Sequence, residues 1–113
     1  MENPLIVNRT YELLTYLTKH LLRTMPKDQK FVLGDRIQSA IADNLESYIT
    51  AYYSNNQEKR PMLKQANIKL EILRHYIRLC HDLEFINIRK YEFISQKINE
   101  IGKMNGAWLK STY

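Results

Sequence analysis

The stretch QEKRPMLKQANIKLEILRHYIRLCHDL, residues 57–83, decides the fold, because its apolar residues recur every three or four positions along its whole length. This spacing puts them on one side of an α-helix, which has about 3.6 residues per turn. The apolar arc consists of Leu63, Ala66, Leu70, Leu73 and Ile77. The stretch therefore predicts a long helix that buries one face against other helices.

Outward from residues 57–83, the same period predicts three further helices and no strand. The Met25-Pro26 step ends the first helix, because the residue before a proline disfavours helix. Asn87 is a good N-cap for the last. The four predicted ranges are about 8–24, 28–53, 57–83 and 88–110. Short connections favour antiparallel neighbours, so we expect a single all-α domain, residues 1–113, that folds as an antiparallel up-down-up-down four-helix bundle.

The charge balance is basic: Lys and Arg outnumber Asp and Glu by 17 to 12, which gives a net charge of +5. This excess favours a polyanion as partner. No apolar run reaches the roughly 18 to 20 residues that span a bilayer, and the first ten residues lack the order of a secretion signal. The single Cys80 agrees with a reducing compartment. We expect a soluble cytoplasmic protein without membrane contact.

A second face of the helix predicted over 57–83 is polar. At about 100° per residue, one narrow stripe holds Arg60, Lys64, Asn67, Glu71, Arg74, Arg78 and His81. Arg74 and Arg78 repel each other across one turn with only Glu71 near enough to offset this, and such crowding favours an anion. The alternative is a solvated face that binds nothing. More cations gather near the first interhelical turn and extend the surface if the fold brings them close: Arg23, Lys27, Lys30 and Arg36.

The same helix is more apolar than one core requires. Beyond the arc described above, its apolar side extends to Ile68, Ile72, Tyr76 and Leu79. We therefore expect contacts with other subunits.

The last helix carries a strict seam with spacings of three and four: Tyr91, Ile94, Ile98, Ile101, Asn105 and Trp108. This spacing packs helices at a shallow angle. Asn105 interrupts the seam, either as a polar residue tolerated near a helix end or as a contact that sets register or oligomeric state. Gly102 and Gly106, one turn apart, would let another helix approach closely, and Gly34 plays the same part in the second helix.

Enzymatic chemistry has one weak candidate. Six residues separate Arg74 from His81, which is similar to the arginine and histidine motif of HEPN ribonucleases. There the histidine would move a proton from the ribose 2′-OH while the arginine stabilised the phosphorane. This spacing also arises by chance in a basic helix. His75, Cys80 and His81 fall on different sides of a helix and predict no metal site. No phosphate loop or acidic cluster is present, so no cofactor is expected.

Three segments resemble a known family. They are MPK-x-x-KF-x-LG-x-RI at residues 25–37, Asn-x-x-Leu-x-x-Leu-Arg-x-x-x-Arg-Leu at 67–79, and EIGKM-x-G-x-W at 100–108. With the residues around them they resemble the accessory variability determinant (Avd) proteins of diversity-generating retroelements, which are four-helix bundles. The resemblance covers nearly the whole chain.

The resemblance implies a bacterial or phage protein that forms a ring-like oligomer, a pentamer, and has no catalytic role. Its basic surface would bind the element's reverse transcriptase and nucleic acid, template RNA or cDNA, during error-prone cDNA synthesis. Under this hypothesis the phosphate contacts come from Arg60, Lys64, Arg74 and Arg78, and then from Lys27, Lys30 and Arg36.

Two other functions stay open. Similar bundle proteins are encoded in intervening sequences of 23S ribosomal RNA genes, so an RNA-binding protein of that group is one alternative. A scaffold whose basic face only aids solubility is another. The chain also departs from the Avd pattern, because Asn105 stands where the family usually has an apolar residue and Ala107 replaces a glycine. We expect Gly102, Gly106 and Trp108 to form a packing device rather than a catalytic one.

Overall fold

The computed structural model describes residues 4–113, and every regular element within that range is helical. The long helices are α1 (Leu5–His20), α3 (Asp35–Tyr52), α4 (Asn56–Asp82) and α5 (Ile88–Ser111). Between α1 and α3 lie the 3-10 turn η1 (Leu22–Thr24), the single turn α2 (Lys27–Gln29) and the π-helical segment η2 (Lys30–Gly34). The prediction of an all-α chain is confirmed.

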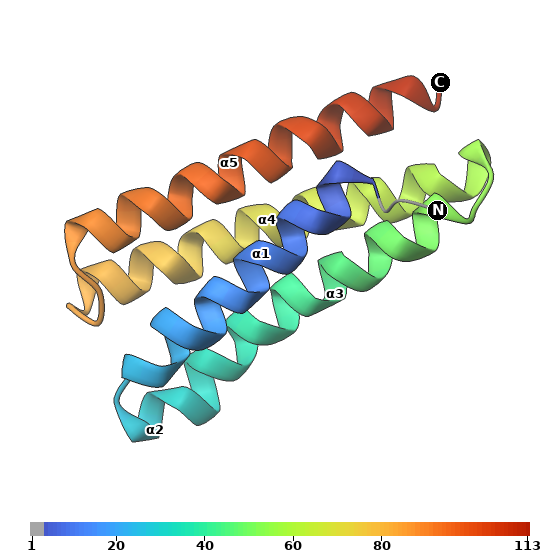
Figure 1. The fold of residues 1–113 in the computed structure, drawn as a ribbon. Coiled ribbons are helices and arrows are strands. Elements are labelled where there is room, and N and C mark those ends of the chain that lie inside the picture. The colour runs from blue at the N-terminus through green and yellow to red at the C-terminus, as the bar shows by residue number, and fades with distance from the viewer. Residues whose placement is uncertain (1–3) are drawn as a thin grey trace.

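The long helices pack side by side with alternating chain direction (Figure 1). α4 packs against both α3 and α5, and α1 packs across α3 and α5 on the other side of the bundle. The molecule is elongated, with extents of 42 × 24 × 22 Å. This is the four-helix bundle that the helix lengths predicted. Within residues 4–113, no helix combines the length and apolar content needed to cross a lipid bilayer.

Side-chain caps fix where α4 and α5 begin. Asn55 accepts a hydrogen bond from the Glu58 amide at 2.8 Å, and the Glu58 carboxylate accepts one from the Asn55 amide at 3.1 Å. This reciprocal capping box satisfies two amides that the first helical turn leaves unpaired. The predicted cap of α5 is confirmed, because Asn87 Oδ1 accepts from the Lys90 amide at 2.9 Å.

The start of the second predicted helix differs from the expectation of one regular α-helix from Asp28. The π-helical segment η2 interrupts it, which inserts one extra residue into the turn. Gly34 is buried there, and a Cβ atom at this position would lie 3.3 Å from Leu22 Cδ2. Gly34 therefore makes room for the turn that precedes it, and not for another long helix. The same segment exposes Phe31 and Val32 by 71% and 59%.

A buried polar network joins three helices in the middle of the apolar core. The Tyr48 hydroxyl donates to Asn105 Oδ1 at 2.6 Å, and Asn105 Nδ2 donates to the Leu63 carbonyl at 3.0 Å. Asn44 Nδ2 donates to the Ala66 carbonyl, also at 3.0 Å. Of the two interpretations of Asn105, the structure supports a contact that sets register, because the residue is fully buried and bonded to α3 and α4.

Cys80 lies fully buried in the core, and burial raises the pKa of its thiol from 9.0 to about 11. Because the folded-state pKa lies above the unfolded value, the contribution of the protonated thiol to the free energy of unfolding is fully present below pH 9. It is lost as the pH rises towards 11. We expect the free energy of unfolding to fall by roughly 2 kcal/mol more in the wild type than in Cys80→Ala between pH 7 and pH 10.5. Urea denaturation at the two pH values measures this difference, and equal losses in both proteins would contradict the assignment.

Candidate nucleic-acid interface

The polar face of α4 borders α5, and side chains of both helices line an open cavity of about 310 Å³. Its lining residues are Glu71, Arg74, His75, Arg78, Tyr91, Ser95 and Asn99. Guanidinium, hydroxyl and amide groups of this kind are the usual donors to phosphate oxygens. We use the name α4–α5 groove for the polar stripe of α4 from Arg78 through Lys64 to Arg60, together with the α5 residues beside it; its hollow part is this cavity, the recess. Two predicted site residues, Arg74 and Arg78, share its recess.

Both arginines of the recess have acidic neighbours on α4. Arg74 pairs with Glu71 and donates through Nε to Asn99 Oδ1 at 3.1 Å. Arg78 Nε lies 3.8 Å from Asp82 Oδ2, and its side chain is 68% exposed. Exposed pairs of this kind contribute only about 0 to 1 kcal/mol, so a phosphate can displace or join them. Arg78 is the less restrained of the two cations, and Arg74 is held in place.

Arg60 has a structural task that its sequence position did not suggest. Its Nε donates to the Thr112 carbonyl at 3.1 Å, and Nη2 donates to the same oxygen. Its Cζ lies 4.7 Å from the ring centre of Tyr113. Lys64 is exposed, with Nζ 6.0 Å from the same ring centre. Arg60 therefore orders the last turn of the chain, while Lys64 keeps its donors for solvent or a ligand.

The two glycines of α5 border the groove in different ways. A Cβ atom at Gly102 would lie 3.4 Å from Arg74 Nη2, so this glycine leaves room for the guanidinium rather than for a helix. A Cβ atom at Gly106 would meet nothing within 4 Å among residues 4–113. Trp108 is half-buried, with its ring 6.3 Å from that of Tyr48 and 5.7 Å from Lys59 Nζ. The expected packing role thus holds for Trp108 against the core, whereas Gly106 faces open space.

The remaining predicted cations do not join this groove. Lys27 lies in α2, Lys30 in η2, and Arg36 in the first turn of α3. Arg36 lines a separate cavity of about 500 Å³ between α3 and α4, with Asp43 and Lys69 in its wall. Lys69 pairs with Asp43 there, which links the two helices. Arg36 therefore lies on the α3 side of α4, and Lys27 and Lys30 lie in the connection between α1 and α3.

Arg74 and His81 line different cavities, although the sequence places them two turns apart on one stripe. The His81 ring stacks on Tyr91, with centroids 4.8 Å apart and planes at 19°. It borders a cavity of about 570 Å³ formed with Asp82 and Phe85, whereas Arg74 borders the recess described above. Among residues 4–113, no group of three or more His, Cys, Asp or Glu side chains is arranged to hold a metal ion.

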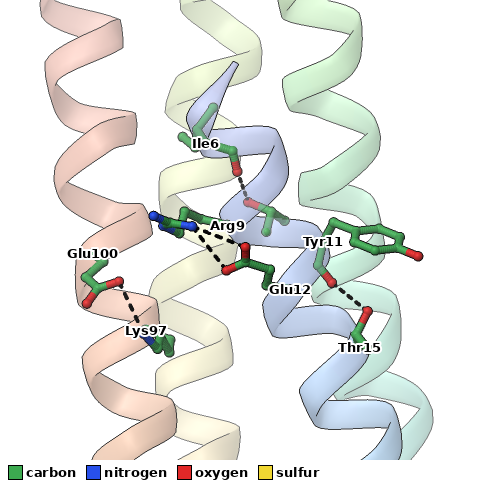
Figure 2. Close-up of polar contacts among 8 residues, drawn as sticks. Ile6, Arg9, Tyr11, Glu12, Thr15, Lys97 and Glu100 are labelled. Atoms are coloured by element: carbon green, nitrogen blue, oxygen red, sulfur yellow. Dashed lines mark hydrogen bonds and ion pairs between the residues drawn. The ribbon is translucent and has the colours of Figure 1, made fainter. Parts of the chain in front are cut away.

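The groove between α1 and α5 carries balanced charges by comparison. Figure 2 shows Arg9 and Glu12 on α1 and Lys97 and Glu100 on α5, each cation paired with the acid on its own helix. The closest distances are 3.1 Å from Arg9 Nη1 to Glu12 Oε1 and 3.7 Å from Lys97 Nζ to Glu100 Oε2. The α1–α5 groove thus holds equal numbers of cations and acids. Arg74 and Arg78 also have acidic partners, so the excess positive charge of the α4–α5 groove comes from Lys64 and Arg60, which form no ion pair among residues 4–113.

Comparison with protein-family models finds a match to the bAvd-like family over residues 4–112. The chain belongs to the bAvd-like family. This confirms the resemblance to the Avd proteins. No curated protein matches the chain.

Sequence reasoning on this bAvd-like chain missed Tyr113, Thr112 and Lys59. The contact of Arg60 with Thr112 joins residues that lie 52 positions apart, and no local period reveals such a contact. A signal was nevertheless present for Tyr113, because seven residues make about two helical turns. Extending α5 by two turns from Gly106 puts Tyr113 on the face that borders α4. The aromatic residue at the end of the groove could have been predicted in this way.

Proposed function

We propose that this bAvd-like protein is a non-catalytic accessory protein of a diversity-generating retroelement. It binds the reverse transcriptase and nucleic acid, template RNA or cDNA, and supports mutagenic reverse transcription. The family match over residues 4–112 is the observation that carries this proposal. A binding role also agrees with a recess in which arginines face hydroxyl and amide groups, while Arg74 and His81 line separate cavities.

The nucleic acid binds along the α4–α5 groove in this proposal. Lys64 and Arg78 are exposed there, and Arg74 supplies a guanidinium held by Asn99. Each phosphate that these cations neutralise releases condensed counterions, which is the main source of affinity for nucleic acid without a preferred sequence. The charge excess of +5 adds attraction at longer range.

The protein assembles with copies of itself through the α3–α4 side in this proposal, and we expect the ring-like pentamer implied by the family. The support is apolar surface that one bundle leaves in solvent. The side chains exposed by 41–71% on η2 and α4 include Phe31, Val32, Ile68, Ile72 and Leu79. Three of them, Phe31, Val32 and Ile72, line one cavity between α3 and α4, and exposed apolar side chains that gather in this way often mark an interface in soluble proteins. A ring needs a second, different patch on each subunit to receive the first.

The proposal predicts a reverse-transcriptase gene beside the gene of this chain, and co-expression with that transcriptase tests it. We expect the two proteins to purify together after nuclease treatment, because the contact is between proteins. The reverse transcriptase of an unrelated retroelement is the control and should not purify with the chain. A location inside a ribosomal RNA gene, or absence of binding to both the transcriptase and RNA at physiological salt, would contradict the proposal.

A further inference from the structure

The α4–α5 groove ends at an aromatic ring that is open to solvent. Tyr113 is 74% exposed, although large apolar rings are usually covered. Arg60 lies over the ring with Cζ 4.7 Å from its centre, and Lys64 Nζ is 6.0 Å from the same point. An exposed aromatic ring beside cations is the combination that single-stranded nucleic acid uses, because a base stacks on the ring while phosphates meet the cations.

The backbone under this ring is held firmly. Thr112 is only 2% exposed, and its hydroxyl donates to the Leu109 carbonyl at 2.6 Å. Arg60 grips the Thr112 carbonyl through Nε and Nη2, so the guanidinium joins the start of α4 to the end of α5. The bonds found within residues 4–113 leave the Nη1 donors of Arg60 available. These bonds fix the residue that precedes Tyr113, which limits the positions that the ring can take and so reduces the conformational entropy lost when a base stacks on it.

We propose that Tyr113 stacks with a base of single-stranded RNA or DNA whose backbone follows the α4–α5 groove from Arg60 towards Arg78. This inference rests on the proposed nucleic-acid binding and adds the strandedness of the ligand and the residue that recognises it. A duplex hides the faces of its bases inside the stack, so it can use the cations but not the ring.

The length of the groove sets the size of the site. Arg60 and Arg78 are 18 positions apart on one helix, which corresponds to about 27 Å. A strand that keeps the spacing of about 3.4 Å found in one strand of duplex DNA covers this distance with roughly eight nucleotides, and a more extended strand with fewer. Single-strand sites of about 4 to 16 nucleotides are usual for one domain. Gly106, which faces open space, leaves room for the backbone between the two ends.

Fluorescence anisotropy with labelled oligothymidylate and oligouridylate of roughly 12 nucleotides tests the inference on the full chain. We expect Tyr113→Ala to weaken both single strands by about 5- to 150-fold, and Tyr113→Phe to bind like the wild type, because stacking needs the ring and not the hydroxyl. Tyr11→Ala, which removes another exposed tyrosine, on α1, is the matched control and should change nothing.

Two further measurements separate stacking from charge. An abasic strand of the same length keeps the phosphates but has no bases, so it should bind wild type and Tyr113→Ala equally. The slope of log affinity against log salt should be the same in both proteins, because the number of neutralised phosphates is unchanged.

The outcomes distinguish this inference from the proposed function. If the wild type binds single strands and Tyr113→Ala binds them equally well, stacking is wrong while the accessory role stands. If Tyr113→Ala weakens the abasic strand as much as the normal one, the ring acts through structure and the inference also fails. If the wild type binds no nucleic acid at all, the stacking inference fails together with the nucleic-acid part of the proposed function, and the co-purification experiment alone decides the binding of the reverse transcriptase.

Discussion

Reversing both charges of the recess, in Arg74→Glu with Arg78→Glu, is expected to weaken nucleic-acid binding strongly. The two guanidinium groups share one cavity, so their loss removes two adjacent phosphate contacts. Each contact on a single strand contributes about 0.7 to the slope of log affinity against log salt, so the slope should fall by about 1.4. When the salt concentration is lowered from about 1 M to about 0.1 M, the affinity of the wild type should therefore rise about 25-fold more than that of the double variant.

The α1–α5 groove provides a matched control for this experiment. Arg9→Glu with Lys97→Glu changes two cations on the side where charges are balanced. Both double variants lower the formal net charge from +5 to +1, because each reversal removes two units. Circular dichroism and sedimentation first establish that folding and subunit number are unchanged. Equal weakening by the two variants would show that net charge alone attracts the nucleic acid, and would remove the α4–α5 groove from the proposal.

The second large effect is expected for stability, in the buried network around Asn105. Tyr48→Phe leaves Asn105 Oδ1 without its donor, and Asn105→Leu leaves the Tyr48 hydroxyl without its acceptor. Leaving one buried polar group unpaired costs about 1 to 3 kcal/mol, so each single variant should lose that much unfolding free energy. The double variant removes both groups and should lose less than the sum, with a coupling of about 0.5 to 3 kcal/mol. Urea denaturation at one fixed protein concentration measures all four proteins.

Asn44 offers the control for this cycle. It is as buried as Asn105 and also donates to a carbonyl of α4, but its Oδ1 has no hydrogen-bond partner among residues 4–113. Asn44→Leu removes an acceptor that is already unpaired, so its cost should be clearly smaller than that of Asn105→Leu. Additive losses in the Tyr48 and Asn105 cycle, or an Asn44→Leu loss as large as that of Asn105→Leu, would contradict this account.

The sequence predicted the helices well because the period of apolar residues follows directly from the geometry of a helix that is buried on one side. The cap at Asn87 was predicted for a similar reason, since the cap is a local interaction. The π-helical segment could not be predicted, because the extra residue that it inserts changes no apolar period; the close approach of Gly34 to Leu22 there is a tertiary contact. The regular period therefore gave one continuous helix where the structure has an interruption.

The candidate site was predicted only in part. The stripe on α4 follows from one helical period, and the structure brings Arg74 and Arg78 to one cavity as expected. Tertiary packing decides which side of α4 meets α3 and which meets α5. The sequence alone could therefore not show whether Arg36 lies near Arg74 and Arg78. The role of Arg60 likewise depended on where the end of α5 lies relative to the start of α4. Such contacts between distant residues leave no local pattern to read.

The two exposed surfaces of α4 are separated around its axis. Ile68, Ile72 and Leu79 lie about 100° from the line through Arg60 and Arg78, given 100° of rotation per residue. A neighbouring subunit on the first surface and a polynucleotide on the second would thus occupy different sectors of the same helix. Subunit assembly and nucleic-acid binding would then not compete for the same surface. A closed ring could bind or release a strand without breaking the contacts between its subunits.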